Sequence, residues 1–209
     1  MGALVETSGM FEGFAKFSKV DGFLSTIEGM ALYFFSSQQS KIHDECFVEI
    51  GSYKGKSSCY IIAGIVKENN GRGTLHCVDH FKGSPEHQKG MAYSKGFSGS
   101  TRKEFDDNIN LMSFSDNVKV HEKTSEEVLK DWKEPVAFIF IDGSHDYEDV
   151  RADFKGWEKH LVVGGIIALH DTNGAWDGPT KVVNTLLDNN KNYKLLSVGS
   201  ITFAEKVSL

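Results

Sequence analysis

The stretch of this sequence best suited to chemistry is Glu49-x-Gly51-x-x-x-Gly55-x-Ser57, which follows the apolar run 46–50. It predicts a strand, a glycine-bearing turn and a helix, whose N–H groups and dipole can hold a polar ligand. The patterns G-x-G-x-x-G and G-x-x-x-x-G-K-[ST], which bind dinucleotides and phosphates, are absent. Glu49 would repel a pyrophosphate, so this corner favours a ligand with an amino or sulfonium group. The alternative is a strand–turn–helix corner without a ligand.

A second acid, Asp79, ends the next apolar run, residues 73–78. Its distance from Glu49 is the one expected between the ends of two successive parallel strands. An acid at this place typically accepts hydrogen bonds from ribose hydroxyls. The alternative role for Asp79 is to cap a helix or a turn.

Alternating strands and helices must position these acids. Strands are predicted at 46–50, 73–78, 118–121, 136–142 and 166–171, with helices at 56–68, 101–112, 124–132, 147–161 and 179–187. A turn is predicted at 163–165, and a hairpin at 194–198 and 201–204 adds an antiparallel strand. The fold class is therefore α/β: a Rossmann-like, doubly wound, seven-stranded, mostly parallel sheet with an antiparallel C-terminal strand and helices on both faces.

Residues 1–40 are predicted to form an N-terminal helical cap or lid, and residues 41–209 the main domain. Met10, Phe11, Phe14, Phe17 and Val20 recur at helical spacing, and a second helix follows that Asp21 could cap. This phenylalanine-rich segment could pack on the sheet edge, cover the site or join copies of the chain as a homo-oligomer. Its polar face lacks the Lys and Arg of membrane-surface helices. The polar loop 81–101 could cover a substrate or simply be mobile.

Composition limits the possible partners and compartment. The 209 residues are 40% hydrophobic and carry a net charge of −6, which argues against a nucleic-acid partner. The longest apolar run, 136–141, is too short to span a membrane. The three cysteines match no zinc pattern, and no signal peptide is evident. We therefore expect a cytoplasmic protein with reduced thiols, one globular domain, and neither a membrane nor a nucleic acid as partner.

The second half of the chain carries a longer signature. It reads Ile141-Asp142-Gly143-Ser144-His145-Asp146-Tyr147-Glu148, then Asp153, then Leu161-Val162-Val163-Gly164-Gly165-Ile166-Ile167-Ala168-Leu169-His170-Asp171-Thr172. This resembles the I-D-G-x-H-x-Y … L-x-x-G-G … H-D-T signature of small bacterial class I S-adenosylmethionine-dependent methyltransferases, of the cephalosporin-hydroxylase and macrolide O-methyltransferase kind. The resemblance covers about residues 20–205.

The resemblance implies S-adenosylmethionine as the cofactor and assigns residues to its parts. Around the methionine part it places Glu49, Gly51, Ser52, Gly55 and Ser57. It assigns Asp79 to the ribose, Ser125 and Glu126 to the adenine, and Asp142, Gly143 and His145 to the place where the sulfonium faces the acceptor. From the residues themselves, Thr124 and Glu127 could instead form only a helix capping box at that turn.

Related catechol-type O-methyltransferases bind a divalent metal through the acids that end the fourth and fifth strands and an amide after the second acid. Asp142 and Asp171 match the acids, but Thr172 stands next and the amide comes one later, at Asn173. Oxygen ligands would suit Mg²⁺, whereas His145 and His170 nearby would tolerate a transition metal.

The implied mechanism needs little beyond positioning and deprotonation of the acceptor. His145 is the candidate base, because its ordinary pKa lies near 6.5, and Asp142 and Asp171 would assist it or hold a metal that acidifies a hydroxyl. A helix-capping role for His145 is the alternative. His170 is expected to point to the other face of its strand from Asp171, away from the site.

The predicted activity, as the resemblance implies, is therefore methyl transfer to oxygen on a small hydroxylated metabolite or a sugar. Two other classes compete: an NAD(P)-dependent oxidoreductase and a module that binds the cofactor without turnover. Glu49 and the missing second glycine of the dinucleotide pattern argue against the first. Asp142, His145 and Asp171 argue against the second.

Overall fold

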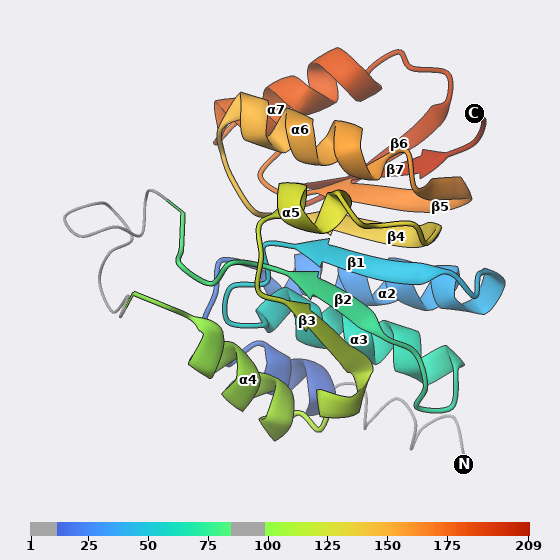
Figure 1. Ribbon diagram of the computed structural model, residues 1–209. Helices are drawn as coiled ribbons and strands as arrows, with labels where there is room; N and C mark the ends of the chain where they lie inside the picture. The colour runs from blue at the N-terminus through green and yellow to red at the C-terminus, as the bar shows by residue number, and fades with distance from the viewer. Residues whose placement is uncertain (1–11, 85–98) are drawn as a thin grey trace.

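The computed structural model describes residues 12–84 and 99–209 and contains a seven-stranded sheet in the order β3-β2-β1-β4-β5-β7-β6 (Figure 1). The strands are β1 (Cys46–Ile50), β2 (Leu75–Val78), β3 (Val118–His121), β4 (Val136–Ile141), β5 (Leu161–Leu169), β6 (Tyr193–Val198) and β7 (Ile201–Lys206). β1 to β5 pair in parallel, and β7 is antiparallel to both β5 and β6. The predicted Rossmann-like sheet with its antiparallel C-terminal strand is confirmed.

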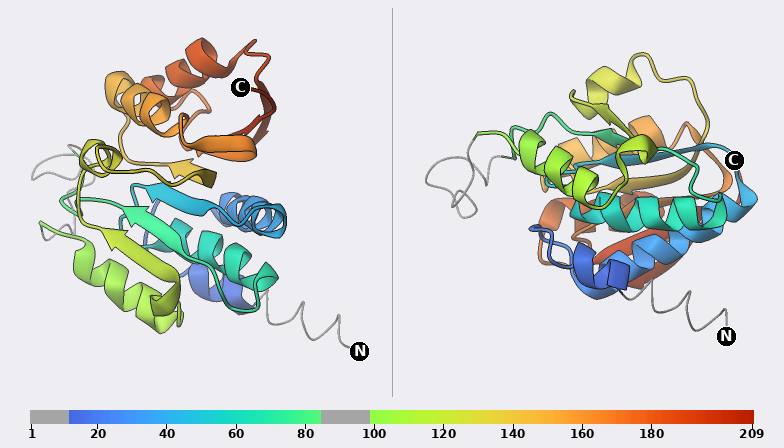
Figure 2. Two further views of the ribbon diagram at one scale, coloured as in Figure 1. Left: turned by 45° about the vertical axis from the view of Figure 1, so that its right-hand side comes forward. Right: turned by 90° about the horizontal axis from the view of Figure 1, so that it is seen from below.

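Helices cover both faces of the sheet (Figures 1 and 2). One face packs against α2 (Thr26–Ile42), α3 (Lys56–Glu68) and α4 (Arg102–Leu111). The other packs against α5 (Ser125–Leu129), α6 (Tyr147–Trp157), and α7 (Asp177–Val182) with the π-helical turn Val183–Leu187 that continues it. Every residue of β4 is buried, as expected for a central strand that is covered on both faces.

The first described residues, from 12 onward, pack into the core against one face of the sheet. Residues 12–17 are helical, and Phe14 and Phe17 belong to the same buried cluster as strand residues of β1 and β4. Met10 and Phe11 lie outside the described residues. Asp21 does not cap α2: Ser25 does, and it forms a capping box with Glu28. A boundary at residue 40 stays a prediction.

Three further expectations differ from the structure or fall outside it. The predicted turn at 163–165 lies within β5, where Gly164 takes a φ of 86° and the pairing with β4 shifts register. α6 ends at Trp157, so Leu161 begins the strand instead of ending the helix. Most of the loop 81–101 lies outside the described residues.

The described residues also bear on membranes and on thiols. In residues 12–84 and 99–209, no helix combines the length and the apolar composition needed to cross a bilayer. Cys46, Cys59 and Cys77 are free thiols, and burial raises the pKa of Cys59 to about 12.

Candidate active site

A cleft of about 690 Å³ opens at the carboxyl ends of the central parallel strands. Residues expected at the site form much of its lining: Gly51, Ser52, Ser57, Asp79, Ser125, Glu126, Asp142, Gly143, His145 and Asp171. These residues follow β1, β2, β3, β4 and β5, so the parallel strands bring them to one edge of the sheet. Two other residues expected at the site, Glu49 and Gly55, are not part of the lining.

The turn after β1 depends on its two glycines. Gly51 has a φ of 85°, and a Cβ there would lie 2.2 Å from the carbonyl oxygen of Asp142. Gly55 also has a φ of 85° and caps α3, where its N–H donates to the carbonyl of Ser52 at 2.8 Å. The first glycine therefore lets two strand ends meet, and the second turns the chain into the helix.

Glu49 lies beneath this turn and is fully buried. Its Oε2 accepts hydrogen bonds from the hydroxyls of Ser52, at 2.7 Å, and Ser58, and from the Cys77 thiol at 3.5 Å. Burial raises the pKa of Glu49, although hydrogen bonds from Ser57, Ser58 and Ser52 oppose that shift. The geometry fits a carboxyl group that holds the turn from below.

Asp79 connects the turn after β1 to the segment after β2. Its Oδ2 accepts the N–H of Tyr53 at 2.8 Å, and its Oδ1 accepts the N–H of Phe81 at 2.6 Å. Both donors have positive φ, 47° for Tyr53 and 56° for Phe81, so the carboxylate supports two strained backbone positions. Asp79 also lines the cleft, and each carboxylate oxygen can accept a second hydrogen bond.

The region expected to hold adenine contains a half-buried carboxyl group, that of Asp153. Thr124 caps α5 in a capping box with Glu127, as expected. Behind it, the indole N–H of Trp157 donates to Ser125 Oγ at 2.8 Å, and Ser125 hydrogen-bonds to Asp153. Burial raises the pKa of Asp153 to about 6, more than the bond from Ser125 lowers it. The sequence interpretation missed this site role of Asp153, although it quoted the residue in the signature.

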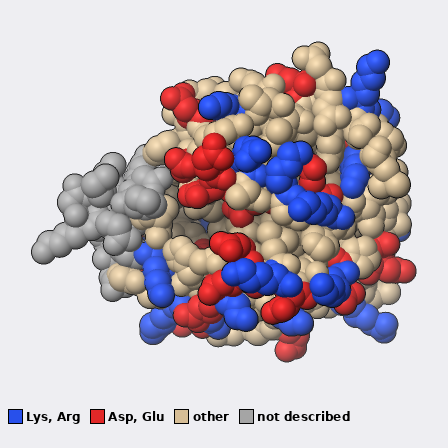
Figure 3. All heavy atoms as spheres, turned by 45° about the horizontal axis from the view of Figure 1, so that its top comes forward, with Lys and Arg blue, Asp and Glu red and all other residues tan. Residues whose placement is uncertain are grey.

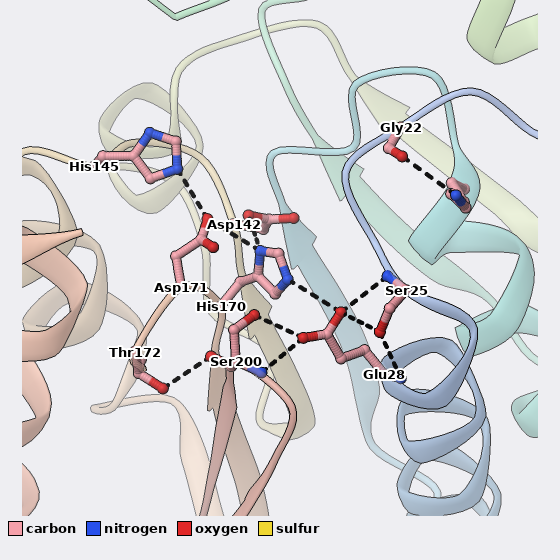
Figure 4. A network of polar contacts seen from close by, with 10 residues as sticks. Gly22, Ser25, Glu28, Asp142, His145, His170, Asp171, Thr172 and Ser200 are labelled. Carbon is pink, nitrogen blue, oxygen red and sulfur yellow. Dashed lines mark hydrogen bonds and ion pairs between the residues drawn. The ribbon is translucent and has the colours of Figure 1, made fainter. Parts of the chain in front are cut away.

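At the ends of β4 and β5, two carboxylates flank one imidazole (Figure 4). His170 Nδ1 lies 3.0 Å from Asp142 Oδ1 and 3.2 Å from Asp171 Oδ2. The expectation that His170 would point away from Asp171 is wrong, because β5 ends at Leu169 and Asp171 has a φ of 58°. Strand alternation no longer applies beyond Leu169, and the left-handed turn brings both side chains into one cluster.

The electrostatics of this cluster favour a charged pair. Burial would lower the pKa of His170, but attraction to Asp142, hydrogen bonds to Asp142 and Asp171, and the nearby Glu28 carboxylate raise it to about 12. Burial would raise the pKa of Asp171, yet hydrogen bonds from His145 and His170 hold it well below its usual value. In this arrangement His170 is an imidazolium, and Asp171 is a carboxylate.

His145 reaches the same cluster from the segment before α6. Its Nε2 lies 2.9 Å from Asp171 Oδ2, and its ring stacks on Trp176 with a centroid distance of 3.8 Å. Trp176 belongs to the segment after Thr172 and was not singled out from the sequence. Asn173, the amide that could have completed a metal site, is exposed, and its Oδ1 accepts the N–H of Ala175.

The cleft is rich in carboxyl groups. Its lining contains Asp79, Glu126, Asp142, Asp149, Asp153 and Asp171, against Lys54, Lys56 and Lys123. Figure 3 shows acidic side chains gathered around a hollow towards the left of the view. An acidic cleft favours a cationic ligand over a phosphate chain.

The fold and the cleft define a Rossmann-like methyltransferase domain, and comparison with known proteins agrees. The sequence model of a family described as "Methyltransferase domain" matches residues 48–172, and the chain belongs to this family. Among solved structures it is similar to the O-methyltransferase NovP, with a TM-score of 0.70 and 16% identity over 88% of this chain and 82% of that one.

Two further structures are similar. The O-methyltransferase TomG from Streptomyces achromogenes, described as involved in tomaymycin synthesis and solved with S-adenosylmethionine, has a TM-score of 0.67 and 14% identity, covering 94% and 90% of the two chains. An O-methyltransferase from Bacillus cereus, solved with S-adenosylhomocysteine, has a TM-score of 0.62 and 18% identity, covering 98% and 91%. At these identities the likeness concerns the fold.

Proposed function

We propose that this chain is an S-adenosylmethionine-dependent O-methyltransferase that acts on a small hydroxylated molecule, such as a sugar or another metabolite. The observation that carries the proposal is that Gly51, Asp79, Asp142 and His145 all line one cleft. In a member of a methyltransferase family, this cleft combines a glycine turn, an acid at the end of the second strand that could bind ribose, and a hydrogen-bonded histidine–aspartate pair. Similar folds solved with S-adenosylmethionine or S-adenosylhomocysteine support the choice of cofactor.

The cofactor would lie across the cleft from the glycine turn to α5. Gly51, Ser52 and Ser57 would surround its methionine part, Asp79 would accept the ribose hydroxyls, and Ser125 with Glu126 would border the adenine. Glu49 and Gly55 would act indirectly, by shaping the turn. Gly143, next to Asp142, would let the sulfonium approach the backbone.

The methyl transfer itself needs orientation and removal of one proton. S-adenosylmethionine supplies an activated methyl group, so the protein must align the acceptor hydroxyl with it. His145, whose Nε2 lies 2.9 Å from Asp171 Oδ2, would take the acceptor's proton. Asp171 then stabilises the imidazolium that forms.

The donor set of the cluster also fits a divalent cation. One ligand atom each from Asp142, His170 and Asp171 lies within 4.8 Å of the other two. Two carboxylates and an imidazole suit a transition metal such as Mn²⁺ better than the all-oxygen sites that Mg²⁺ prefers. A cation held by these three residues would lower the pKa of the acceptor hydroxyl.

We also propose that copies of the chain associate through α2. Ile27, Met30 and Phe34 are 63%, 38% and 55% exposed, and Phe23, which precedes the helix, is 62% exposed. Within the helix, the spacing of Ile27, Met30 and Phe34, three and four residues, places these three along one side, a pattern that suits two-fold helix pairing. Phe23 also lines the cleft, so a second copy would border the site. Light scattering should give twice the chain mass, and the monomer mass for Phe34→Glu.

We propose that the protein acts in the cytoplasm and that its methyl acceptor is a small molecule. The carboxyl groups of the cleft would repel a nucleic-acid backbone, which supports a small molecule as the partner. The three free thiols are compatible with a reducing compartment.

The test of the function is transfer of a labelled methyl group from S-adenosylmethionine to a panel of sugars, phenols and hydroxy acids. We expect a labelled ether product with at least one of them, and its loss in His145→Gln while the variant still binds S-adenosylhomocysteine. Retained transfer in His145→Gln would contradict the role of His145. Absence of cofactor binding by the unmodified protein would contradict the function.

A further inference from the structure

A glutamate from α2 lies against the back of the proposed active centre. Glu28 is only 6% exposed, although it belongs to a helix near the start of the chain. It comes to lie beside His170, more than a hundred residues later in the sequence (Figure 4). Burying a carboxylate is costly unless it is paired and hydrogen-bonded, so this position calls for partners.

Four hydrogen bonds fix the carboxylate of Glu28. Its Oε2 accepts the N–H of Ser25 at 2.9 Å and the Ser25 hydroxyl at 2.6 Å. Its Oε1 accepts the N–H and the hydroxyl of Ser200, both at 2.7 Å. Four donors on its two oxygens fix the position of this group and favour its charged form, the carboxylate.

The two ring nitrogens of His170 face different groups: Nδ1 faces Asp142 and Asp171, and Nε2 faces Glu28. Nε2 of His170 lies 3.8 Å from Glu28 Oε2, within ion-pair range but beyond an ordinary hydrogen bond. Among the described residues, this buried nitrogen has no hydrogen-bond partner. A buried ring N–H needs an acceptor, and the Glu28 carboxylate is the group placed to provide one.

We propose that Glu28 is a positioning residue of the active centre, which holds the Nε2–H of His170 and so keeps Nδ1 turned towards Asp142 and Asp171. This inference rests on the proposed methyltransferase function. An imidazole whose far N–H is held by a carboxylate is fixed in tautomer and in orientation. The same orientation presents Nδ1 to the two aspartates whether a proton or a cation lies between them.

The hairpin turn between β6 and β7 completes this support. Gly199 has a φ of 62°, and a Cβ there would lie 2.5 Å from Glu28 Oε1, so the turn can approach the carboxylate only as glycine. On the other side of the turn, the carbonyl of Ser200 accepts the N–H of Thr172 at 2.8 Å and the Thr172 hydroxyl at 2.9 Å. The turn thus holds Glu28 and also the residue that follows Asp171.

A capping role alone does not account for these contacts. Glu28 forms the capping box of α2 with Ser25, and such a box needs only the helix terminus. Here the second oxygen is bound by Ser200, and the carboxylate faces His170. Glu28 and Ser200 lie outside residues 48–172, the part that the methyltransferase family model matches. Support for the centre therefore comes from both ends of the chain.

The test is the imidazole N–H signal of His170 in protein that carries ¹⁵N-labelled histidine and is saturated with S-adenosylhomocysteine. His170→Gln assigns the signal. Glu28→Gln keeps the size of the side chain and removes its charge. Glu68→Gln is the matched control, because Glu68 also binds α2, through the Ser37 hydroxyl at 2.8 Å and Lys41 at 3.4 Å, but is not part of the cleft lining.

We expect wild type to show a proton on His170 Nε2, Glu28→Gln to shift or lose that signal, and Glu68→Gln to leave it unchanged. All three proteins should bind S-adenosylhomocysteine within about twofold of one another. With any acceptor that wild type methylates, Glu28→Gln should lower kcat by roughly 10–100-fold while KM for the cofactor stays within about twofold.

An unchanged His170 signal in Glu28→Gln would overturn the proposal and leave Glu28 a helix cap. Wild type without a proton on His170 Nε2 would overturn it too. If Glu28→Gln fails to fold, Ser200→Ala takes its place, because it keeps the Glu28 carboxylate and removes one hydrogen-bond donor. Ser200→Ala should produce a smaller change in the His170 signal, and no change would count against the proposal. Failure of wild type to bind S-adenosylhomocysteine would refute the proposed function separately, because the His170 signal does not depend on catalysis.

Discussion

Replacing Asp79 by alanine should damage stability and cofactor binding separately. The carboxylate accepts two backbone N–H groups, at 2.8 Å and 2.6 Å, from Tyr53 and Phe81. A hydrogen bond to a charged group contributes about 1.5–3 kcal/mol, so the lost pair should lower the free energy of unfolding by roughly 3–6 kcal/mol. For a chain of this length, that corresponds to a fall in Tm of roughly 6–24 °C.

Loss of the ribose contact should then appear in the affinity for S-adenosylhomocysteine. One charged hydrogen bond of about 1.5–3 kcal/mol corresponds to a Kd raised about 10–100-fold. Calorimetric titration well below the Tm of the variant measures this without interference from unfolding. Asp116→Ala, an exposed acid in the 3₁₀ turn Ser115–Asn117, is the control and should change neither quantity.

The two effects can be told apart. A lower Tm with unchanged affinity would mean that Asp79 serves only the two backbone turns, and the ribose assignment would fail. In both Tm and affinity, Asp79→Asn should lie between wild type and Asp79→Ala, because its amide oxygen can still accept one N–H group while the charge is gone.

Two more predictions concern the pH dependence and the metal. The pKa of Asp153 rises from 3.8 to about 6 on folding, so the folded chain binds this proton more tightly, and the free energy of unfolding should fall by about 3 kcal/mol as the pH rises from about 3 to about 7. Asp153→Asn should therefore be more stable than wild type at pH 8 and equal to it near pH 4; equal stability at both pH values in denaturant titrations would refute the shift. EDTA should abolish methyl transfer and Mn²⁺ restore it if Asp142 and Asp171 hold a cation, whereas full activity in EDTA would leave deprotonation to His145 alone.

The order of the strands and the acids at their ends could be predicted from the sequence for a physical reason. Apolar runs that alternate with amphipathic helices form a parallel sheet, whose carboxyl ends meet at one edge. Asp79, Asp142 and Asp171 could therefore be assigned to one cleft before the structure was known. The role of the glycines in the turn after β1 could also be predicted from the sequence, because a positive φ and a close backbone approach both require glycine.

The contacts behind the site were not predictable in this way. The position of His170 depends on the left-handed φ of Asp171, which no local pattern signals in a non-glycine residue. The contact of Glu28 with Ser200 joins residues 172 positions apart. The capping box of Ser25 with Glu28 was readable as a local signal, but it does not show what the second carboxylate oxygen meets.

The most direct test of the central claim is a thermal unfolding scan of the protein with S-adenosylhomocysteine and, in parallel, with NAD⁺. A ligand at about a hundred times its Kd should add about 2.7 kcal/mol to the free energy of unfolding. For this chain length, that is a rise in Tm of roughly 5–10 °C. The account predicts this rise with S-adenosylhomocysteine and none with NAD⁺; a rise with NAD⁺ alone, or with neither compound, would contradict it.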